Sequence, residues 1–388
     1  MSLAVAVNLI PVFLTTLGSA LGNAHGLTNE QLGRIGAVTF IGLVSGILIT
    51  GPLADRFGPK AFAVLGNLLV AAGLAVLGVA YTYNAVLMAV ALMGFGAGVL
   101  DMVLSPIVCA FQPEQRTTAM NWLHSFYCVG AVTTVLVGAV ALRVGIGWRT
   151  ISLWLILLPV IVAVGFLNLR IPPLIKAGQQ RHALRQLCRR PYFLVALAAI
   201  FLAGSTELGM AQWLPAYAEK SLHYSKWTGG MALLAFSVAM ALGRMIVGML
   251  GTRLRPLPLM AACCWASVLL FLLACFAPLP WVALLASVCV GFTGSCLWPS
   301  TLGVTADRFP HGGASMFAML GAMGNIGGIF MPWVVGIIAD EKALNIGIAT
   351  ATFCPLLMAL LLIWMQRHGH EPVHADSPIA TDTLAADI

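Results

Sequence analysis

Charged residues are scarce in this sequence, and their scarcity excludes most classes of protein. Asp, Glu, Lys and Arg make up 9% of the 388 residues, while 60% are hydrophobic and the mean hydropathy is +0.96. A soluble globular domain carries about 25% charged residues, so a soluble fold is excluded. The alternation of apolar and polar positions that marks membrane-spanning strands is also absent. We therefore expect an all-α integral membrane protein.

Motifs of catalysis and of metal binding are missing as well. The sequence has no H-E-x-x-H, no Ser-Lys pair, no paired aspartates within an apolar run and no nucleotide-binding loop. Its nine cysteines are scattered, mostly within apolar runs, without the spacing of a metal site or a disulfide framework. No basic surface interleaved with aromatic residues accompanies the net charge of +7. We expect no enzyme, and neither a metal, a cofactor nor a nucleic-acid partner.

Twelve apolar runs are present, each close to the about 20 residues that a helix needs to span a bilayer. They cover residues 3–24, 31–54, 60–80, 85–108, 119–142, 148–169, 191–217, 226–250, 257–277, 280–306, 313–338 and 344–366. We expect twelve transmembrane helices in two six-helix halves, at 1–170 and 191–366. A basic linker at 171–190 joins the halves, and a disordered tail follows at 367–388.

Basic residues indicate the orientation in the membrane. The links that follow even-numbered runs hold most of the basic residues outside the runs. The segment from Arg170 to Arg190 alone carries six basic residues and no acid. Because loops rich in Lys and Arg stay in the cytoplasm, we expect both termini there, in a bacterial inner membrane.

The densest group of charges in the first half is GPLADRFGPK, at residues 51–60. A polar turn between two spans must reach a water face. Gly51 permits a close approach of two helices, and Asp55 can accept bonds from the start of a neighbouring helix. Arg56 and Lys60 are long enough to reach lipid headgroups.

This arrangement resembles the signature loop of the major facilitator superfamily, which joins the second and third helices. The resemblance implies that Asp55 bonds to a neighbouring helix and locks the state open to the outside, with Arg56 and Lys60 as its partners. It also implies that the carrier works as a monomer. The candidate gating residues are Gly51, Asp55, Arg56, Gly58, Lys60, Arg244 and Arg253.

The two halves also resemble each other. A degenerate copy of the loop begins at Gly243, and in it Gly248 and Arg253 stand 197 positions after Gly51 and Arg56. Parallel six-helix repeats are the arrangement of this superfamily. The second copy has Thr252 where the first has Asp55, so we expect two gates of unequal strength.

Ionisable residues inside a span are costly and mark candidate functional sites. Asp101 lies deep in the fourth run, where burial favours the neutral form that a proton carrier needs. We expect it to face the polar set of the fifth run, which is Asn121, His124 and Tyr127. A structural acid is the alternative. Arg244 either neutralises an acid across the bundle, holds an anionic substrate, or is the structural arginine that this family often places there.

The seventh run combines an acid, an amide and aromatic rings, at Glu207, Gln212 and Trp213. Such a mixture suits a sugar, because polar groups bond hydroxyls and rings cover the C–H surface. The aromatic residues can equally anchor the membrane interface. The candidate solute contacts are Asn121, Tyr127, Glu207, Gln212, Trp213, Trp298 and Asn325, and the candidate proton-coupling residues are Asp101, His124 and Glu207.

The placement of Asp101, Asn121, His124 and Glu207 resembles the fucose permease-like branch of the superfamily. That resemblance implies proton-coupled symport of a sugar or another small polar solute, with Asp101 in the coupling role. Members of the branch have an acid in the first helix, where this sequence has Thr15, so fucose itself is not implied. The alternative is efflux of a drug or metabolite in exchange for protons.

Overall fold

The computed structural model describes residues 1–21, 27, 29–171 and 184–368, and within these ranges helix is the only regular secondary structure. Eleven helical segments are long and apolar enough to cross a membrane, and Ser2–Phe13 of α1 adds a shorter apolar helix. The prediction of an all-α membrane protein with twelve spans is confirmed.

Eight spans are single helices: α1 (Ser2–Leu21), α2 (Asn29–Phe57), α3 (Pro59–Gly78), α4 (Tyr83–Phe111), α5 (Arg116–Arg143), α11 (Lys226–Leu250), α12 (Pro256–Phe276) and α15 (Gly313–Glu341). Four spans are each built from two helices: α6 (Trp148–Leu155) with α7 (Leu157–Asn168), α9 (Pro191–Ala211) with α10 (Leu214–Lys220), α13 (Pro280–Gly294) with α14 (Leu297–Arg308), and α16 (Leu344–Thr350) with α17 (Phe353–His368).

Proline explains each of these four interruptions. Pro159, Pro215, Pro299 and Pro355 each stand three or four residues after the point where the helix is broken. A proline has no N–H to bond the carbonyl four residues earlier, and its ring crowds that carbonyl. The residue four positions before each proline is thus left with a carbonyl that another donor can use.

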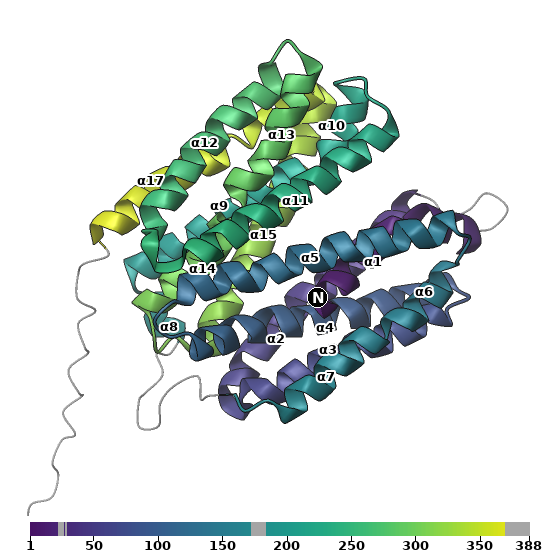
Figure 1. Cartoon of the computed structure of the whole chain (residues 1–388), viewed down its shortest axis with the longest axis horizontal. Helices are drawn as coiled ribbons and strands as arrows, with labels where there is room; N and C mark the ends of the chain where they lie inside the picture. Colours follow the sequence, from purple (N-terminus) through teal and green to yellow (C-terminus); the bar gives the residue numbers. More distant parts are fainter. Residues whose placement is uncertain (22–26, 28, 172–183, 369–388) are drawn as a thin grey trace, which may run out of the picture.

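The helices form two bundles (Figure 1): α1–α7 lie together in one, and α9–α17 lie together in the other. Between the bundles, α2 packs on α15, and α5 packs on α11 and α14. Figure 1 shows the ribbons of the two bundles closest near α14 and diverging toward α6 and α10.

Two parts of the expected organisation fall on residues that the structure does not describe. Residues 172–183 of the expected linker lie outside the described residues, and its described part contains the short helix α8 (Leu184–Leu187). Residues 369–388 of the expected tail also lie outside them, while α17 extends to His368.

Glycine allows α2 and α4 to pack with their backbones in contact. A Cβ at Gly98 would overlap the carbonyl of Leu43, and a Cβ at Gly94 would overlap the carbonyl of Thr39. Small residues of this kind are the usual means of close helix packing in a bilayer, where apolar side chains gain little from leaving lipid. This contact fixes the position of Asp101, which follows Gly98 on α4.

Candidate functional site

The signature loop closes one end of the molecule. The carboxylate of Asp55, near the end of α2, accepts hydrogen bonds from the backbone N–H groups of Ala314 (2.7 Å) and Ser315 (2.9 Å) and from the Ser315 hydroxyl. These N–H groups belong to the first turn of α15, where no helical acceptor exists and the helix dipole favours a negative charge. Asp55 thus links the two bundles across the packed face of α2 and α15.

Glycine at two positions makes this contact possible. A Cβ at Gly51 would overlap Ala318 of α15, so the glycine lets α2 approach. Gly313 precedes the capped amides with φ +66°, a conformation that favours glycine, and a Cβ there would lie 2.6 Å from the Asp55 carboxylate.

The other candidate gating residues of the loops lie near this end with different partners. Lys60 Nζ donates to the carbonyl of Leu167 in α7 (2.8 Å), and the guanidinium of Arg56 lies over the Phe57 ring. Gly58 has φ +84° at the turn between α2 and α3. Arg253 is exposed in the short 3-10 helix η1 (Gly251–Arg253).

The second copy of the loop occupies the equivalent place in the other bundle. Gly248 packs against Trp122 of α5, as Gly51 packs against Ala318 of α15. Gly251 lies beside Thr118 of α5. Thr118 stands 197 positions before Ser315, the residue that bonds Asp55 in the first copy. The side chain of Thr252 is outside the described residues, so the structure does not compare it with Asp55.

Further contacts close the same end, and the sequence did not indicate them. Arg116, at the start of α5, donates to the carbonyl of Ala306 (2.8 Å) and lies 3.5 Å from Asp307, at the end of α14. Asn121, one turn further along α5, donates to Ser300 of α14 (3.0 Å) and is fully buried. Asn121 therefore joins the two bundles, rather than facing an open cavity as a solute contact would.

Asp101 has a different neighbour from the one expected. Its carboxylate lies next to Gly321 of α15, and Asn325, whose amide donates to the Gly321 carbonyl, follows one turn later on the same helix. The expectation that it faces Asn121 and His124 of α5 is therefore wrong, because α4 turns this residue toward the other bundle. Two of the candidate residues, Asp101 and Asn325, meet at the junction between the bundles.

A second polar group lies where α9, α11 and α5 meet. Arg244 Nη2 donates to Glu207 Oε2 at 2.7 Å, and the two side chains are 2% and 15% exposed. Arg244 Nε donates to the carbonyl of Ser295 (2.9 Å), and Nη1 donates to the Cys128 sulfur (3.0 Å) and to the carbonyl of His124 (3.4 Å). Arg244 therefore neutralises an acid of its own bundle and also contacts the other bundle.

The acceptor at Ser295 follows from the interruption between α13 and α14. Residue 299 is a proline, so the Ser295 carbonyl has no helical N–H partner, and Arg244 bonds it instead. Pro299 was the signal in the sequence that could have indicated this contact.

The remaining candidates serve different purposes. The Nε2 of His124 is buried without a hydrogen-bond partner, and the Tyr127 hydroxyl accepts from Asn8 of α1 (3.4 Å). Trp213 donates to the carbonyl of Pro332 in α15 (2.9 Å), so its polar group already has a partner within the bundle. Gln212 is exposed beside it.

Trp298 lies between two helices of its bundle, against Gly204 of α9 and Gly324 of α15. It is partly exposed, and Gly204 is one turn before Glu207 on α9. The indole thus lies between α9 and α15, at the level of Gly204 and Gly324. Within the described residues, no three His, Cys, Asp or Glu side chains converge where a metal ion could bind.

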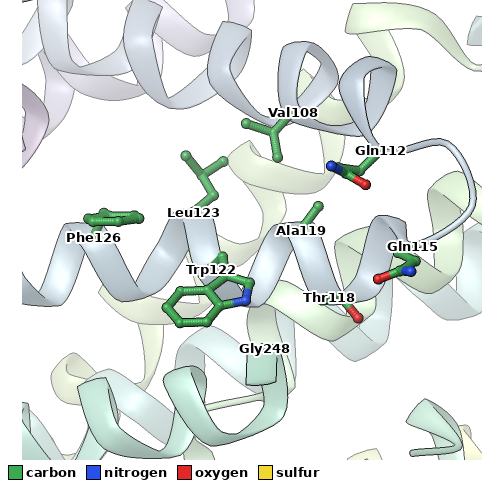
Figure 2. Close-up of a pocket in the computed structure, with 9 residues that line it drawn as sticks. All are labelled: Val108, Gln112, Gln115, Thr118, Ala119, Trp122, Leu123, Phe126 and Gly248. Atoms are coloured by element: carbon green, nitrogen blue, oxygen red, sulfur yellow. The ribbon is translucent and has the colours of Figure 1, made fainter. Parts of the chain in front are cut away.

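A cleft of about 500 Å³ lies elsewhere, between the end of α4, the start of α5 and Gly248 of α11 (Figure 2). Its lining is Val108, Gln112, Gln115, Thr118, Ala119, Trp122, Leu123, Phe126 and Gly248. None of the candidate solute or proton residues lines this cleft, so we do not assign the solute to it.

Comparison with known proteins agrees with this architecture. The fold matches the outward conformation of FucP, the fucose:proton symporter of E. coli, with a TM-score of 0.81, 19% identity and coverage of 94% of this chain and 95% of that one. At this identity the likeness concerns the fold.

The matches to curated relatives cover smaller shares of the two sequences. A gentisate transporter of Corynebacterium glutamicum is 24% identical over 90% of this chain and 77% of its own length. The 4-hydroxybenzoate transporter PcaK of Pseudomonas aeruginosa is 28% identical over 52% of this chain and 44% of its own length. Across the curated relatives, the match spans from 22% to 77% of their lengths.

The sequence pattern of one family matches residues 1–236 and 228–381, almost the whole chain. Together with the twelve spans in two repeats, this match identifies the chain as a transporter of the Major Facilitator Superfamily, and not an enzyme.

Proposed function

We propose that this protein is a proton-coupled symporter of a small polar solute and works by alternating access. Asp101 is the observation that carries the proposal. It is an acid within the span α4, and its carboxylate lies next to Gly321 of α15, which belongs to the other bundle. A proton on Asp101 therefore changes the charge at a contact between the parts that must move relative to each other. Only such a difference between states lets a proton shift their balance.

Asp55 and Arg116 support the gating part of the proposal. Both link the bundles at the end where α2 finishes and α5 begins, so this end is closed. With the basic links in the cytoplasm, this is the inner face of a bacterial inner membrane. Met1 itself lies beside Gly130, midway along α5, so the structure does not bear on the predicted side of the termini. The structure then corresponds to a carrier open to the outside, as the FucP match also suggests. The same face also carries the candidate gating residues Arg56, Gly58, Lys60 and Arg253.

The class of solute is supported by the polar groups near the junction. Asn325, Glu207 and the partly exposed Trp298 offer an amide, an acid and an aromatic face. A sugar such as that carried by FucP suits this set. An aromatic acid, the named solute of the gentisate and 4-hydroxybenzoate transporters, is the other class.

The test replaces Asp101 with asparagine in purified protein reconstituted into liposomes. Asp101→Asn keeps the size and the capacity to hydrogen-bond but cannot release a proton. We expect loss of solute accumulation driven by a pH gradient, with exchange between equal solute pools retained. Glu341→Gln, which removes an exposed acid at the far end of α15, is the control and should accumulate solute like wild type.

Accumulation by Asp101→Asn at the wild-type level would make Asp101 a structural residue and move coupling to Glu207 or His124. Movement of solute toward the more acidic side against its own gradient, opposite to the protons, would instead indicate efflux in exchange for protons.

A further inference from the structure

The two members of the ion pair between Arg244 and Glu207 have different numbers of hydrogen-bond partners. Arg244 is fixed by acceptors from three places: the Ser295 carbonyl, the Cys128 sulfur and the His124 carbonyl. Glu207 is held by Arg244 alone among its assigned hydrogen bonds, and it is the more exposed partner, at 15% against 2%. The cation is anchored, while its counter-ion can be exchanged.

A purely structural role is a poor explanation of this pair. Buried ion pairs often contribute little net stability, because desolvation of the two charges offsets their attraction. An arginine kept charged inside a span marks a functional site, and arginine suits planar recognition of a carboxylate through its forked N–H groups.

The surroundings offer a flat aromatic surface against the same helix that carries Glu207. The indole of Trp298 packs against Gly204, three residues before Glu207 on α9, which is about 4.5 Å along the helix axis. Tyr127 of α5 directly precedes Cys128, whose sulfur accepts from Arg244 Nη1. A carboxylate on Arg244 would thus place an attached ring beside aromatic side chains.

Few other groups compete for a proton there. From α5, the titratable groups facing the pair are His124, Tyr127 and Cys128, and the carbonyl of His124 already accepts from Arg244. From α14 and α15, the neighbours of this part of α9 are Trp298, Gly324, Gly327, Gly328 and Met331, which do not titrate. From α17, which also packs on α9, the nearby titratable group is the Cys354 thiol, which donates to the Met331 sulfur. Glu207 is therefore the carboxylate whose protonation leaves Arg244 without a counter-ion.

We propose that Arg244 binds the carboxylate of a small aromatic acid, which takes the place of Glu207 when Glu207 takes up a proton. This rests on the proposed symport and names its solute class. The charges balance: one cation and one carboxylate are present before, and one cation, one solute carboxylate and one neutral acid are present after. Because Arg244 also contacts α5, the exchange occurs at the boundary between the bundles.

The experiment compares probes of the same shape with and without a charge. Binding of 4-hydroxybenzoate, gentisate and the neutral 4-hydroxybenzamide to the full-length purified protein is measured by calorimetry at two pH values. We expect the acids to bind at least tenfold more tightly than the amide, and more tightly at the lower pH. Glu207→Gln should keep acid binding and lose its pH dependence. Arg244→Gln should lose preference for the acid.

Single variants leave one charge unpaired inside the membrane and can fail to fold. The double variant Glu207→Gln/Arg244→Gln carries neither charge, and it should fold and bind the acid no better than the amide. Asp101→Asn should still bind the acid, which separates this inference from the proposed coupling.

Equal binding of acid and amide to the wild type, or binding of neither, would overturn the inference. Proton-driven uptake of a neutral sugar with no acid binding would leave the proposed symport standing and remove only the role of Arg244.

Discussion

Replacement of Asp55 by asparagine tests how strongly the signature loop holds one end closed. The carboxylate uses one oxygen for the N–H of Ala314 and the other for the N–H and hydroxyl of Ser315. Asn keeps one accepting oxygen, so Asp55→Asn loses the second acceptor and the charge while the side chain keeps its size.

The magnitude follows from these two losses. A hydrogen bond to a charged group contributes about 1.5–3 kcal/mol. The charge at a helix start adds about 0.3–1 kcal/mol. Because a factor of ten in an equilibrium corresponds to about 1.4 kcal/mol, a net loss of about 2–4 kcal/mol shifts the balance roughly 30- to 700-fold toward the state open at this end.

The assay measures the distance between the bundles at the opposite end. Spin labels carried by unnatural amino acids at Val144, after α5, and Trp227, at the start of α11, are both exposed. We expect the distribution to shift to shorter distances in Asp55→Asn, with slower transport. Glu341→Gln removes an acid from the other end of α15 and should leave the distribution unchanged. An Asp55→Asn distribution that matches the wild type, with unaltered transport, would refute the gating argument.

Three further predictions concern contacts between helices. Arg116→Gln should weaken closure of the same end less than Asp55→Asn does, because Gln still reaches a carbonyl; an equal or larger distance shift would contradict this. Gly98→Ala should lower the thermal unfolding temperature in detergent, since its Cβ overlaps the carbonyl of Leu43; an unchanged temperature would show that α2 yields. Trp213→Phe should lose about 1 kcal/mol of stability with its bond to Pro332 and leave solute affinity unchanged, so a large change in affinity would return Trp213 to the solute site.

Several features could be predicted from the sequence because their causes are local. A span needs a continuous apolar run, and each run can be recognised without knowledge of its neighbours. The loop at residues 51–60 is likewise contained in ten consecutive residues. The repeat was visible because Gly248 and Arg253 stand at a constant offset from Gly51 and Arg56.

The interruptions of four spans were also within reach, although the sequence analysis treated them as continuous. Pro299 breaks the tenth span and frees the carbonyl of Ser295, which Arg244 then uses. A proline inside an apolar run was part of the signal, but Pro11, Pro52, Pro106 and Pro332 lie inside continuous helices, so proline alone did not decide where a span breaks.

The partners of the polar residues were decided only by the tertiary structure. From the sequence, Asp101 belonged with the polar set that follows it, yet its carboxylate lies against Gly321 of α15 in the other bundle. The sequence showed Arg244 as a cation and Glu207 as an acid, and it did not pair them. A partner depends on the rotation of each helix and on which helices touch. The rotation and the contacts of a helix are set where a small residue meets the backbone of a distant helix, as Gly98 of α4 meets the Leu43 carbonyl of α2. Such contacts leave no local pattern, so the sequence determined the spans and the signature loop, while packing decided which buried charges meet.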